Sequence, residues 1–208
     1  KDSHRKKNLE KFQDRLANLT FFDPACGSGN FLIIAYREIR KLELKIIREL
    51  HDTKQHRMDV SILSKIHVDK FYGIEFNEFS ARIAETALWM MDHLMNNELS
   101  KQFGISYTRI PLKKSPNIVN ADALVMDWNE LLPSSKCSYI LGNPPYGGSK
   151  VTTVEQRNQI KRIANLGKSG GTLDYVTGWF LKAGDYVNKQ TTIGFVATNS
   201  ITQGEQVG

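Results

Sequence analysis

The feature that most limits the fold of this chain is a repeated alternation of short apolar runs with longer amphipathic segments. The apolar runs predict strands at residues 19–22, 70–76, 117–124, 137–143 and 191–200. The periodic segments predict helices at residues 5–18, 30–50, 78–97 and 172–188. Strands that alternate with helices form a parallel sheet covered on both faces. We therefore expect an α/β fold with a doubly wound, mostly parallel sheet, truncated because the later strands of such sheets do not follow residue 200.

Two segments carry weaker patterns. The polar sequence of residues 51–67 predicts an insertion with a short helix around residues 60–66. The sequence of residues 147–172 predicts a loop. The letters GKSGG at 167–171 are part of the P-loop pattern, but that pattern needs a glycine where Arg162 stands and a strand before it. The letters ELK at 43–45 match the ExK pattern of restriction nucleases, yet they lie inside a predicted helix. We interpret both matches as chance.

The composition is that of one soluble globular domain, with 208 residues of which 40% are hydrophobic and 24% charged. No apolar run approaches the roughly 20 residues that span a bilayer, and the first residues lack the apolar segment of a signal peptide. We therefore expect a cytoplasmic protein without a membrane partner. The two cysteines, Cys26 and Cys137, offer neither a disulfide framework nor zinc-ligand spacing, and the histidines are scattered, so no metal site is expected.

The charge balance is moderately basic. Twenty-eight Lys and Arg against 22 Asp and Glu give a net charge of +6, which suits a polyanionic partner without demonstrating one. The basic run at residues 4–7 opens a helix whose other positions alternate in charge. This pattern favours a solvated helix face over a DNA-binding patch.

A glycine-rich turn, DPACGSGNF at residues 23–31, follows the first strand and opens a helix, which is the context of a nucleotide site. Gly27 and Gly29 can adopt positive φ and let backbone amides approach a ligand. The dinucleotide pattern GxGxxG fails because Leu32 stands at the place of its third glycine. Asp23, at the strand end, would repel a pyrophosphate but suits an ammonium group. The turn therefore indicates a ligand with a cationic amino-acid moiety.

Two further acidic residues stand at the ends of the next strands. Glu75 ends the second strand, where a carboxylate can accept both hydroxyls of a ribose. Asp122 ends the third strand and could accept a hydrogen from an adenine amino group. Any one of these acids alone is more typical of a solvated loop or a helix cap. Three successive strands that each end in an acid favour one shared site.

The stretch YILGNPPYGGS, residues 139–149, ends a strand with an amide, two prolines and a tyrosine. The side-chain oxygen of Asn143 and the carbonyl of Pro144 can converge on one NH₂ group, because the prolines hold the backbone rigid. Accepting both hydrogens of an exocyclic amine draws electron density onto its nitrogen and favours the pyramidal form that attacks. Tyr146 supplies a flat face for a planar ring. A proline turn with Tyr146 as a packing residue is the alternative reading of the motif alone.

Together, DPACGSGNF and NPPY resemble the S-adenosylmethionine-dependent amino methyltransferases that modify adenine N6 in DNA, in the gamma class whose cofactor motif precedes the catalytic one. Residues 19–43, 71–96, 109–128 and 196–207 extend the likeness. They are similar to the methyltransferase region of large single-chain type II (IIG-like) restriction-modification enzymes, which fuse nuclease, methyltransferase and DNA-recognition parts. The resemblance is weakest at residues 51–67 and 147–172.

The resemblance implies a Rossmann-like methyltransferase fold with S-adenosyl-L-methionine as cofactor. The cofactor-binding residues that it implies are Asp23, Pro24, Ala25, Cys26, Gly27, Gly29, Asn30, Phe31, Glu75, Phe76, Asp122 and Ala123. Among them, Phe76 would pack on the adenine of the cofactor. The catalytic residues that it implies are Asn143, Pro144, Pro145 and Tyr146. Methyl transfer would be a direct in-line displacement onto a base flipped out of the duplex.

The same resemblance implies that residues 1–208 are a methyltransferase catalytic core from a longer chain. Its partner would be double-stranded DNA, with the recognition domain and any nuclease elsewhere in that chain. We expect the isolated 208 residues to bind the cofactor weakly and to methylate little DNA. Targets such as cytosine N4, RNA or a protein glutamine stay open, and so does a nonenzymatic binding module with a degenerate methyltransferase fold. The recognition sequence cannot be read, because base-edge contacts set it.

Overall fold

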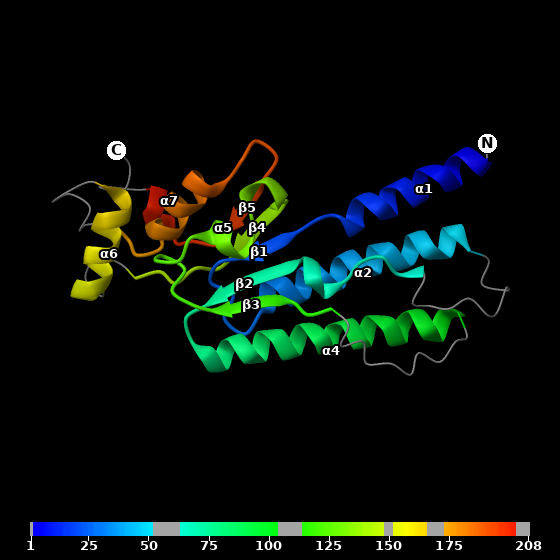
Figure 1. Ribbon diagram of the computed structural model, residues 1–208, viewed down its shortest axis with the longest axis horizontal. Helices are drawn as coiled ribbons and strands as arrows, with labels where there is room; N and C mark the ends of the chain where they lie inside the picture. Colours follow the sequence, from blue (N-terminus) through cyan, green and yellow to red (C-terminus); the bar gives the residue numbers. More distant parts are fainter. Residues whose placement is uncertain (1, 52–62, 104–113, 148–151, 166–172, 203–208) are drawn as a thin grey trace.

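Within the described residues, five parallel strands form the central sheet (Figure 1). The computed structural model describes residues 2–51, 63–103, 114–147, 152–165 and 173–202. From one edge to the other the strands are β3 (Asn117–Asn120), β2 (Phe71–Glu75), β1 (Phe21–Asp23), β4 (Tyr139–Gly142) and β5 (Thr192–Phe195). The chain builds outward from β1 to β3, then returns to the other side of β1. The doubly wound parallel sheet is confirmed, and its switch point lies between β1 and β4.

Side chains of the strands alternate between two helical layers, as the pleat of a strand requires. On one face, Phe71 is buried beneath the long helices α1 (Asp2–Ala17), α2 (Asn30–Leu50) and α4 (Glu78–Phe103). On the other face, Phe22 and Ile74 pack with residues of α5 (Trp128–Leu131) and α7 (Thr177–Tyr186). Helix α6 (Val154–Ala164) and the 3₁₀ turns η1 (Val68–Lys70), η2 (Ser134–Lys136) and η4 (Asn199–Thr202) complete the described elements.

Helices α2 and α4 run side by side well beyond the sheet (Figure 1). Helix α2 covers the predicted residues 30–50, but α4 continues to Phe103 instead of ending at residue 97. The extension is stabilised because Leu99 and Phe103 are buried with Leu44 and Ile47 of α2. Among the described helices, none combines the length and apolar character needed to cross a bilayer.

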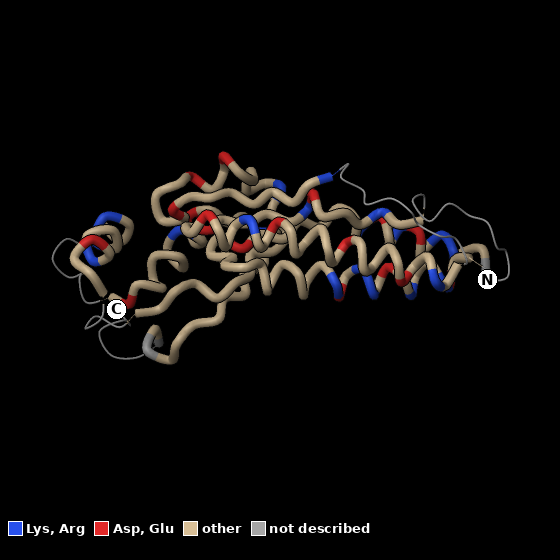
Figure 2. Tube along the Cα trace, turned by 90° about the horizontal axis from the view of Figure 1, so that it is seen from below, with Lys and Arg blue, Asp and Glu red and all other residues tan. Residues whose placement is uncertain are grey.

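The basic run in α1 lies on an exposed helix face. Residues 3–8 are exposed, and the guanidinium of Arg5 pairs with Glu49 of α2. Figure 2 shows basic and acidic residues interspersed along the helices at the N-terminal end of the molecule. This arrangement agrees with the solvated face predicted for residues 4–7.

Strands β3 and β5 are shorter than predicted, ending at Asn120 and Phe195 instead of residues 124 and 200. After β3 the backbone turns: the amides of Val125 and Met126 donate to the carbonyl of Asp122 at 3.0 and 2.9 Å. Asp122 therefore lies in a turn beyond the strand and not at its end. Strand β1, by contrast, includes Asp23, which was expected just after it.

The prediction of a loop over residues 147–172 was wrong for residues 154–164, which form α6. Its capping box explains the helix: Thr153 Oγ1 accepts from the amide of Gln156, and Gln156 Oε1 accepts from the amide of Thr153. That signal, T-x-x-Q, is present in the sequence. Residues 148–151 and 166–172, with the letters GKSGG, lie outside the described residues.

Of the short helix predicted around residues 60–66, Leu63 is helical and residues 64–66 are not, while residues 60–62 lie outside the described part of the chain. The backbone amides of Lys65 and Ile66 instead donate to the carboxylate of Glu43, at 2.6 and 3.2 Å. A buried side chain of α2 therefore takes the hydrogen bonds that a helix would have made within itself.

Candidate active site

The site is built at the carboxyl edge of the sheet, where β1, β2 and β4 end side by side. Asp23 of β1 is in register with Gly73 of β2, and Glu75 ends β2 two residues later. The NPPY motif starts at Asn143, directly after β4. The predicted residues from separate parts of the chain thus converge on one edge, next to the switch point of the sheet, where ligands of such folds bind.

The glycine turn has the backbone conformation that only glycine adopts freely. Gly27 and Gly29 have φ of 55° and 84°, and α2 begins at Asn30 immediately afterwards. A side chain on Gly29 would also lie 3.0 Å from Cβ of Ala84, so the turn rests directly on α4. The turn therefore holds the first amides of α2 at the sheet edge, where backbone N–H groups can meet a ligand.

Cys26 attaches the glycine turn to strand β2. Its amide donates to the carbonyl of Ile74 at 3.0 Å, and its sulfur fills the space where Gly73 has no side chain. Burial raises the pKa of the Cys26 thiol, so it stays protonated and unreactive. The carbonyl of Cys26 accepts from the amide of Gly29 at 2.8 Å, which closes the turn. Cys137 is likewise a buried free cysteine.

Asp23 is a buried carboxylate that has no ion-pair partner among the described residues; its side chain is 1% exposed. Its Oδ1 accepts a hydrogen bond from the amide of Ala25 at 3.0 Å. Burial raises its pKa to about 7; the Ala25 amide lowers it, and the charge of Glu75 raises it further. A cation supplied by a ligand would satisfy this charge.

Strand β4 meets Asp23 through a residue without a side chain. A Cβ on Gly142 would lie 2.4 Å from Asp23 Oδ1. Gly142 is the last residue of β4, and Asn143 follows it. The close approach therefore places the start of the NPPY motif beside the acidic end of β1.

Glu75 is held by the backbone of the glycine turn. Its Oε2 accepts from the amide of Gly27 at 2.8 Å, and its Oε1 accepts from the amide of Asn77 at 2.9 Å. Each carboxylate oxygen can accept a second hydrogen bond, so two remain open for a diol. The adjacent Phe76 ring is 77% exposed and offers an apolar face at the same edge.

Asp122 is oriented from two sides. Its Oδ1 accepts from the amide of Leu124 at 2.8 Å, and its Oδ2 accepts from Nε2 of Gln159 at 2.8 Å. Gln159 belongs to α6, the helix that was predicted as loop, so reasoning from the sequence missed it. The neighbouring Ala123 is buried.

The NPPY motif presents its amide and its ring to solvent. Asn143, Pro145 and Tyr146 are exposed, whereas Pro144 is buried and anchors the motif. Asn143 makes no side-chain hydrogen bond with other described residues. The amide and the aromatic face are therefore open to a ligand at the end of β4.

The segment before α7 fixes the residue that follows the motif. The amide of Gly147 donates to Asp174 at 3.0 Å, and its carbonyl accepts from Thr152 Oγ1 at 2.9 Å and from the amide of Tyr175 at 3.3 Å. In α7, Trp179 donates its indole N–H to the carbonyl of Pro24 at 3.0 Å. The residues 174–179 thus tie the NPPY motif to the glycine turn. Their sequence is typical of an ordinary core helix, so no local signal predicted that they connect the two motifs.

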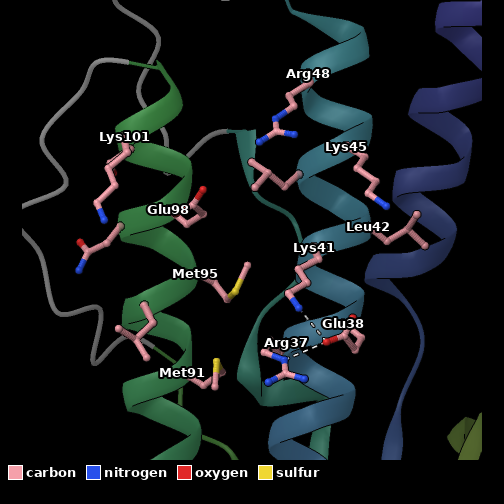
Figure 3. A pocket seen from close by; sticks show the side chains of 14 residues that line it. Arg37, Glu38, Lys41, Leu42, Lys45, Arg48, Met91, Met95, Glu98 and Lys101 are labelled. Carbon is pink, nitrogen blue, oxygen red and sulfur yellow. Dashed lines mark hydrogen bonds and ion pairs between the residues drawn. The ribbon is translucent and has the colours of Figure 1, made fainter.

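Two hollows elsewhere on the protein do not include the residues of this edge. One is a groove between α2 and α4, rimmed by cations such as Arg37 and Lys41, with Met91 and Met95 among its apolar lining (Figure 3). Glu38 on the same rim pairs with Arg37 and Lys41, which partly neutralises them. The other lies at the amino ends of the strands. The candidate site is therefore the open carboxyl edge itself.

Comparisons with known proteins agree with this placement of the fold. The family described as MmeI, DNA-methyltransferase domain, matches residues 1–208. DNA methyltransferase A of Bacillus subtilis (strain 168) is 38% identical over 203 residues, which are 96% of this chain and 23% of that protein. The structure of the Type IIL restriction-modification enzyme MmeI in complex with DNA has a TM-score of 0.93 and 49% identity, covering 97% of this chain and 27% of that one.

More distant structures share the fold alone. The ATP-dependent Type ISP restriction-modification enzyme LlaBIII bound to DNA has a TM-score of 0.56 at 16% identity, over 91% of this chain and 13% of that one. The chain thus spans about a quarter of the length of the first two relatives. The similarity to these structures supports the α/β methyltransferase fold that the sheet order shows.

Proposed function

Because this chain belongs to the family of MmeI DNA-methyltransferase domains, we propose that it is the catalytic core of an S-adenosyl-L-methionine-dependent, adenine-specific DNA methyltransferase. The enzyme methylates the N6 amine of an adenine in a specific DNA site, as part of a restriction-modification protein. The observation that carries the proposal is the contact between β1 and β4: Asp23, which has no ion-pair partner among the described residues, lies against Gly142, and the exposed Asn143 follows Gly142. A cation site and an amine site therefore adjoin.

The residues at the edge fit the cofactor. Asp23 is a buried carboxylate without a cation among the described residues, as an ammonium site should be before its ligand binds. Glu75 has open acceptor positions for the ribose hydroxyls. Asp122 has open acceptor positions for the adenine amine. When bound, S-adenosyl-L-methionine supplies a methyl group on an electrophilic sulfonium.

The remaining residues of the proposed cofactor site line the turn and the adenine pocket. Phe76 packs on the adenine ring, and the other lining residues are Pro24, Ala25, Cys26, Gly27, Gly29, Asn30, Phe31 and Ala123. At Gly27 no atom lies within 4 Å of where a side chain would begin, so the backbone of the turn is uncovered there, whereas Gly29 packs against Ala84. Such an uncovered backbone lets a ligand approach closely.

The NPPY motif binds and activates the target amine. Asn143 Oδ1 and the Pro144 carbonyl accept its two hydrogens, which raises the electron density on nitrogen. Pro145 stiffens the turn, and Tyr146 stacks on the base. The amine of a stacked, paired adenine cannot reach this edge, so the base is flipped out of double-stranded DNA.

Residues 1–208 supply the catalytic core, and target recognition lies elsewhere in the parent chain. This division is supported by the relatives, of which this chain covers 23% and 27%. A nuclease, where the parent carries one, also lies outside these residues.

The identity of the substrate is tested with the full-length protein and S-adenosylmethionine labelled with tritium in its methyl group. Duplex DNA, RNA and protein are offered separately, and digested DNA is separated into nucleosides. We expect label in N6-methyl-2′-deoxyadenosine from the DNA. Label in N4-methylcytosine would move the target to cytosine, and label only in RNA or protein glutamine would overturn a DNA substrate. Calorimetry that detects no cofactor binding would indicate a nonenzymatic module.

The Asn143→Ala variant of the full-length protein tests the amine site. Removing one preorganised acceptor should lower the rate of methyl transfer about 10²- to 10³-fold, while the Kd for the cofactor stays within about twofold. Asn158→Ala, on the exposed face of α6, is the matched control and should retain full activity. Unchanged methylation by the Asn143 variant would reduce NPPY to a turn.

A further inference from the structure

We propose that Gln159, held in place by Tyr175, is a positioning residue that aims the Asp122 carboxylate at the 6-amino group of the cofactor's adenine. This inference rests on the proposed function and deepens it, because it explains how the protein selects an amino-purine. Neither residue belongs to a motif that sequence reasoning singled out.

The evidence starts with the two acceptor atoms of Asp122. Oδ1 is taken by the amide of Leu124 within the same turn, at 2.8 Å. Oδ2 is taken by Nε2 of Gln159 at 2.8 Å, across 37 residues of sequence. One hydrogen bond on each oxygen fixes the plane of the carboxylate but leaves a further acceptor position on each. Gln159 therefore orients Asp122 without closing it to a ligand.

Tyr175 decides which end of the Gln159 amide faces Asp122. Its hydroxyl donates to Oε1 of Gln159 at 2.8 Å, so the NH₂ end is left for the carboxylate. Burial, with the charge of Asp122 adding to it, raises the pKa of Tyr175 to about 12, so the hydroxyl keeps its proton at every working pH. Both hydrogen bonds of this relay point toward the carboxylate, an arrangement in which each strengthens the other.

Packing holds both members of the relay. Ile160, next to Gln159, is 1% exposed and lies where Gly178 of α7 has no side chain, 2.8 Å from the position of a Cβ. The same Gly178 position lies 3.0 Å from Leu124, whose amide binds Asp122. The Tyr175 ring packs edge-on against Trp179 with centroids 5.2 Å apart. The packing of helix α6 therefore fixes the position of Gln159 next to Asp122.

The relay carries no charge, which distinguishes it from an ion pair. A lysine or arginine at position 159 would neutralise Asp122 and compete with the ligand, whereas an amide orients it and leaves its charge available. A purely structural role, docking α6, would not depend on which group stands at position 6 of a bound purine. This difference gives the test.

The experiment measures the Kd of the full-length protein for S-adenosylhomocysteine and for its analogue that carries hydrogen in place of the 6-amino group. The wild type should prefer the amino compound by about tenfold or more, the value of a hydrogen bond to a charged group. Gln159→Ala should lose most of this preference, with the affinity for the 6-hydrogen analogue unchanged. Tyr175→Phe, which keeps the ring, should shift the preference in the same direction by a smaller factor.

Asn158→Ala, which removes an amide from the same helix, is the matched control and should keep the wild-type preference. Equal loss of affinity for both ligands in the Gln159 and Tyr175 variants, or no change in either, would overturn the inference and leave these residues as supports of α6. If Gln159→Ala fails to fold, Tyr175→Phe decides. Failure of the wild type to bind S-adenosylhomocysteine would instead overturn the proposed function, and this inference with it.

Discussion

Two groups of carboxylates in this protein show how the same side chain serves opposite purposes. The buried ionic cluster, between α1, α2 and α4, consists of Arg40, Glu43 and Asp92 with polar neighbours. The edge carboxylates are Asp23 and Glu75, at the ends of β1 and β2, and Asp122, in the turn after β3. In the first group Arg40 Nε lies 3.2 Å from Glu43 and Nη1 lies 2.9 Å from Asp92. In the second group no described Lys or Arg pairs with any of the three.

The buried ionic cluster uses its hydrogen-bonding capacity within the protein. Beyond Arg40, Glu43 accepts from Ser64 Oγ, from Gln13 Nε2 and from the amides of Lys65 and Ile66. These donors and Arg40 occupy both carboxylate oxygens of Glu43, which leaves no acceptor position for a ligand. The match of Glu43 to the ExK pattern is thus a structural carboxylate, and Lys45 of that pattern is exposed on another face of α2.

The edge carboxylates are held by neutral donors instead. Backbone amides orient all three, and Gln159 adds a side-chain amide to Asp122. Their negative charge has no cation partner among the described residues, which is unfavourable for the buried Asp23 unless a ligand supplies one. The difference supports the proposal that the second group binds a ligand, whereas the first stabilises the fold.

The largest effect is expected from removing the cation of the buried ionic cluster. Arg40→Met leaves the buried carboxylates of Glu43 and Asp92 without their cation and should lower the free energy of unfolding by about 3–5 kcal/mol. The urea midpoint of this domain's transition in the full-length protein measures the loss. Arg37→Met, on the same helix in a more exposed pair with Glu38, is the control and should cost less than about 1 kcal/mol. Similar losses in both variants would erase the contrast between the two groups.

The pH dependence of cofactor binding tests the edge group. Asp23 has a pKa of about 7 in the folded, ligand-free protein, raised chiefly by burial from its usual 3.8. The folded state therefore binds this proton more tightly than the unfolded state, and stability from this group falls as pH rises from about 4 to 7. A cationic ligand needs the ionised form, so its affinity should weaken about tenfold for each pH unit below 7. Calorimetry between pH 5.5 and 8 measures both the affinity and the proton released.

Asp23→Asn sharpens this prediction. The variant should bind the cofactor weakly with little pH dependence below 7, and above pH 7 it should be at least as stable as the wild type, because a desolvated charge is gone. A wild-type pH profile that the variant reproduces would assign the titration to another group.

The smallest effect is expected from the apolar face at the edge. Phe76 and Phe79 are 77% and 75% exposed, so neither supports the core. Phe76→Ala should weaken cofactor binding several-fold, about 1 kcal/mol, through loss of stacking on the adenine. Phe79→Ala should leave the Kd unchanged, and both variants should unfold like the wild type. Equal effects of the two substitutions on binding would remove Phe76 from the site.

Local patterns determined much of this protein. Helix α2 begins and ends as predicted because Gly29 marks its start and its apolar stripe runs without interruption to residue 50. The glycine turn, the acids after the strands and the NPPY motif were all readable as candidates, since each is a contiguous signal. The capping box of α6 was readable too, although residues 147–172 were predicted as loop.

Only the tertiary structure decided which of these residues meet and which carboxylates stay free. Nothing local shows that Gly142 abuts Asp23, that Gln159 reaches Asp122 across 37 residues, or that Glu43 is closed off by Arg40 and the backbone of residues 65 and 66. A local sequence pattern predicts the conformation of its own segment. The availability of a charge depends on its neighbours in space, because burial and partners, not residue type, determine whether a carboxylate holds the fold together or awaits a ligand.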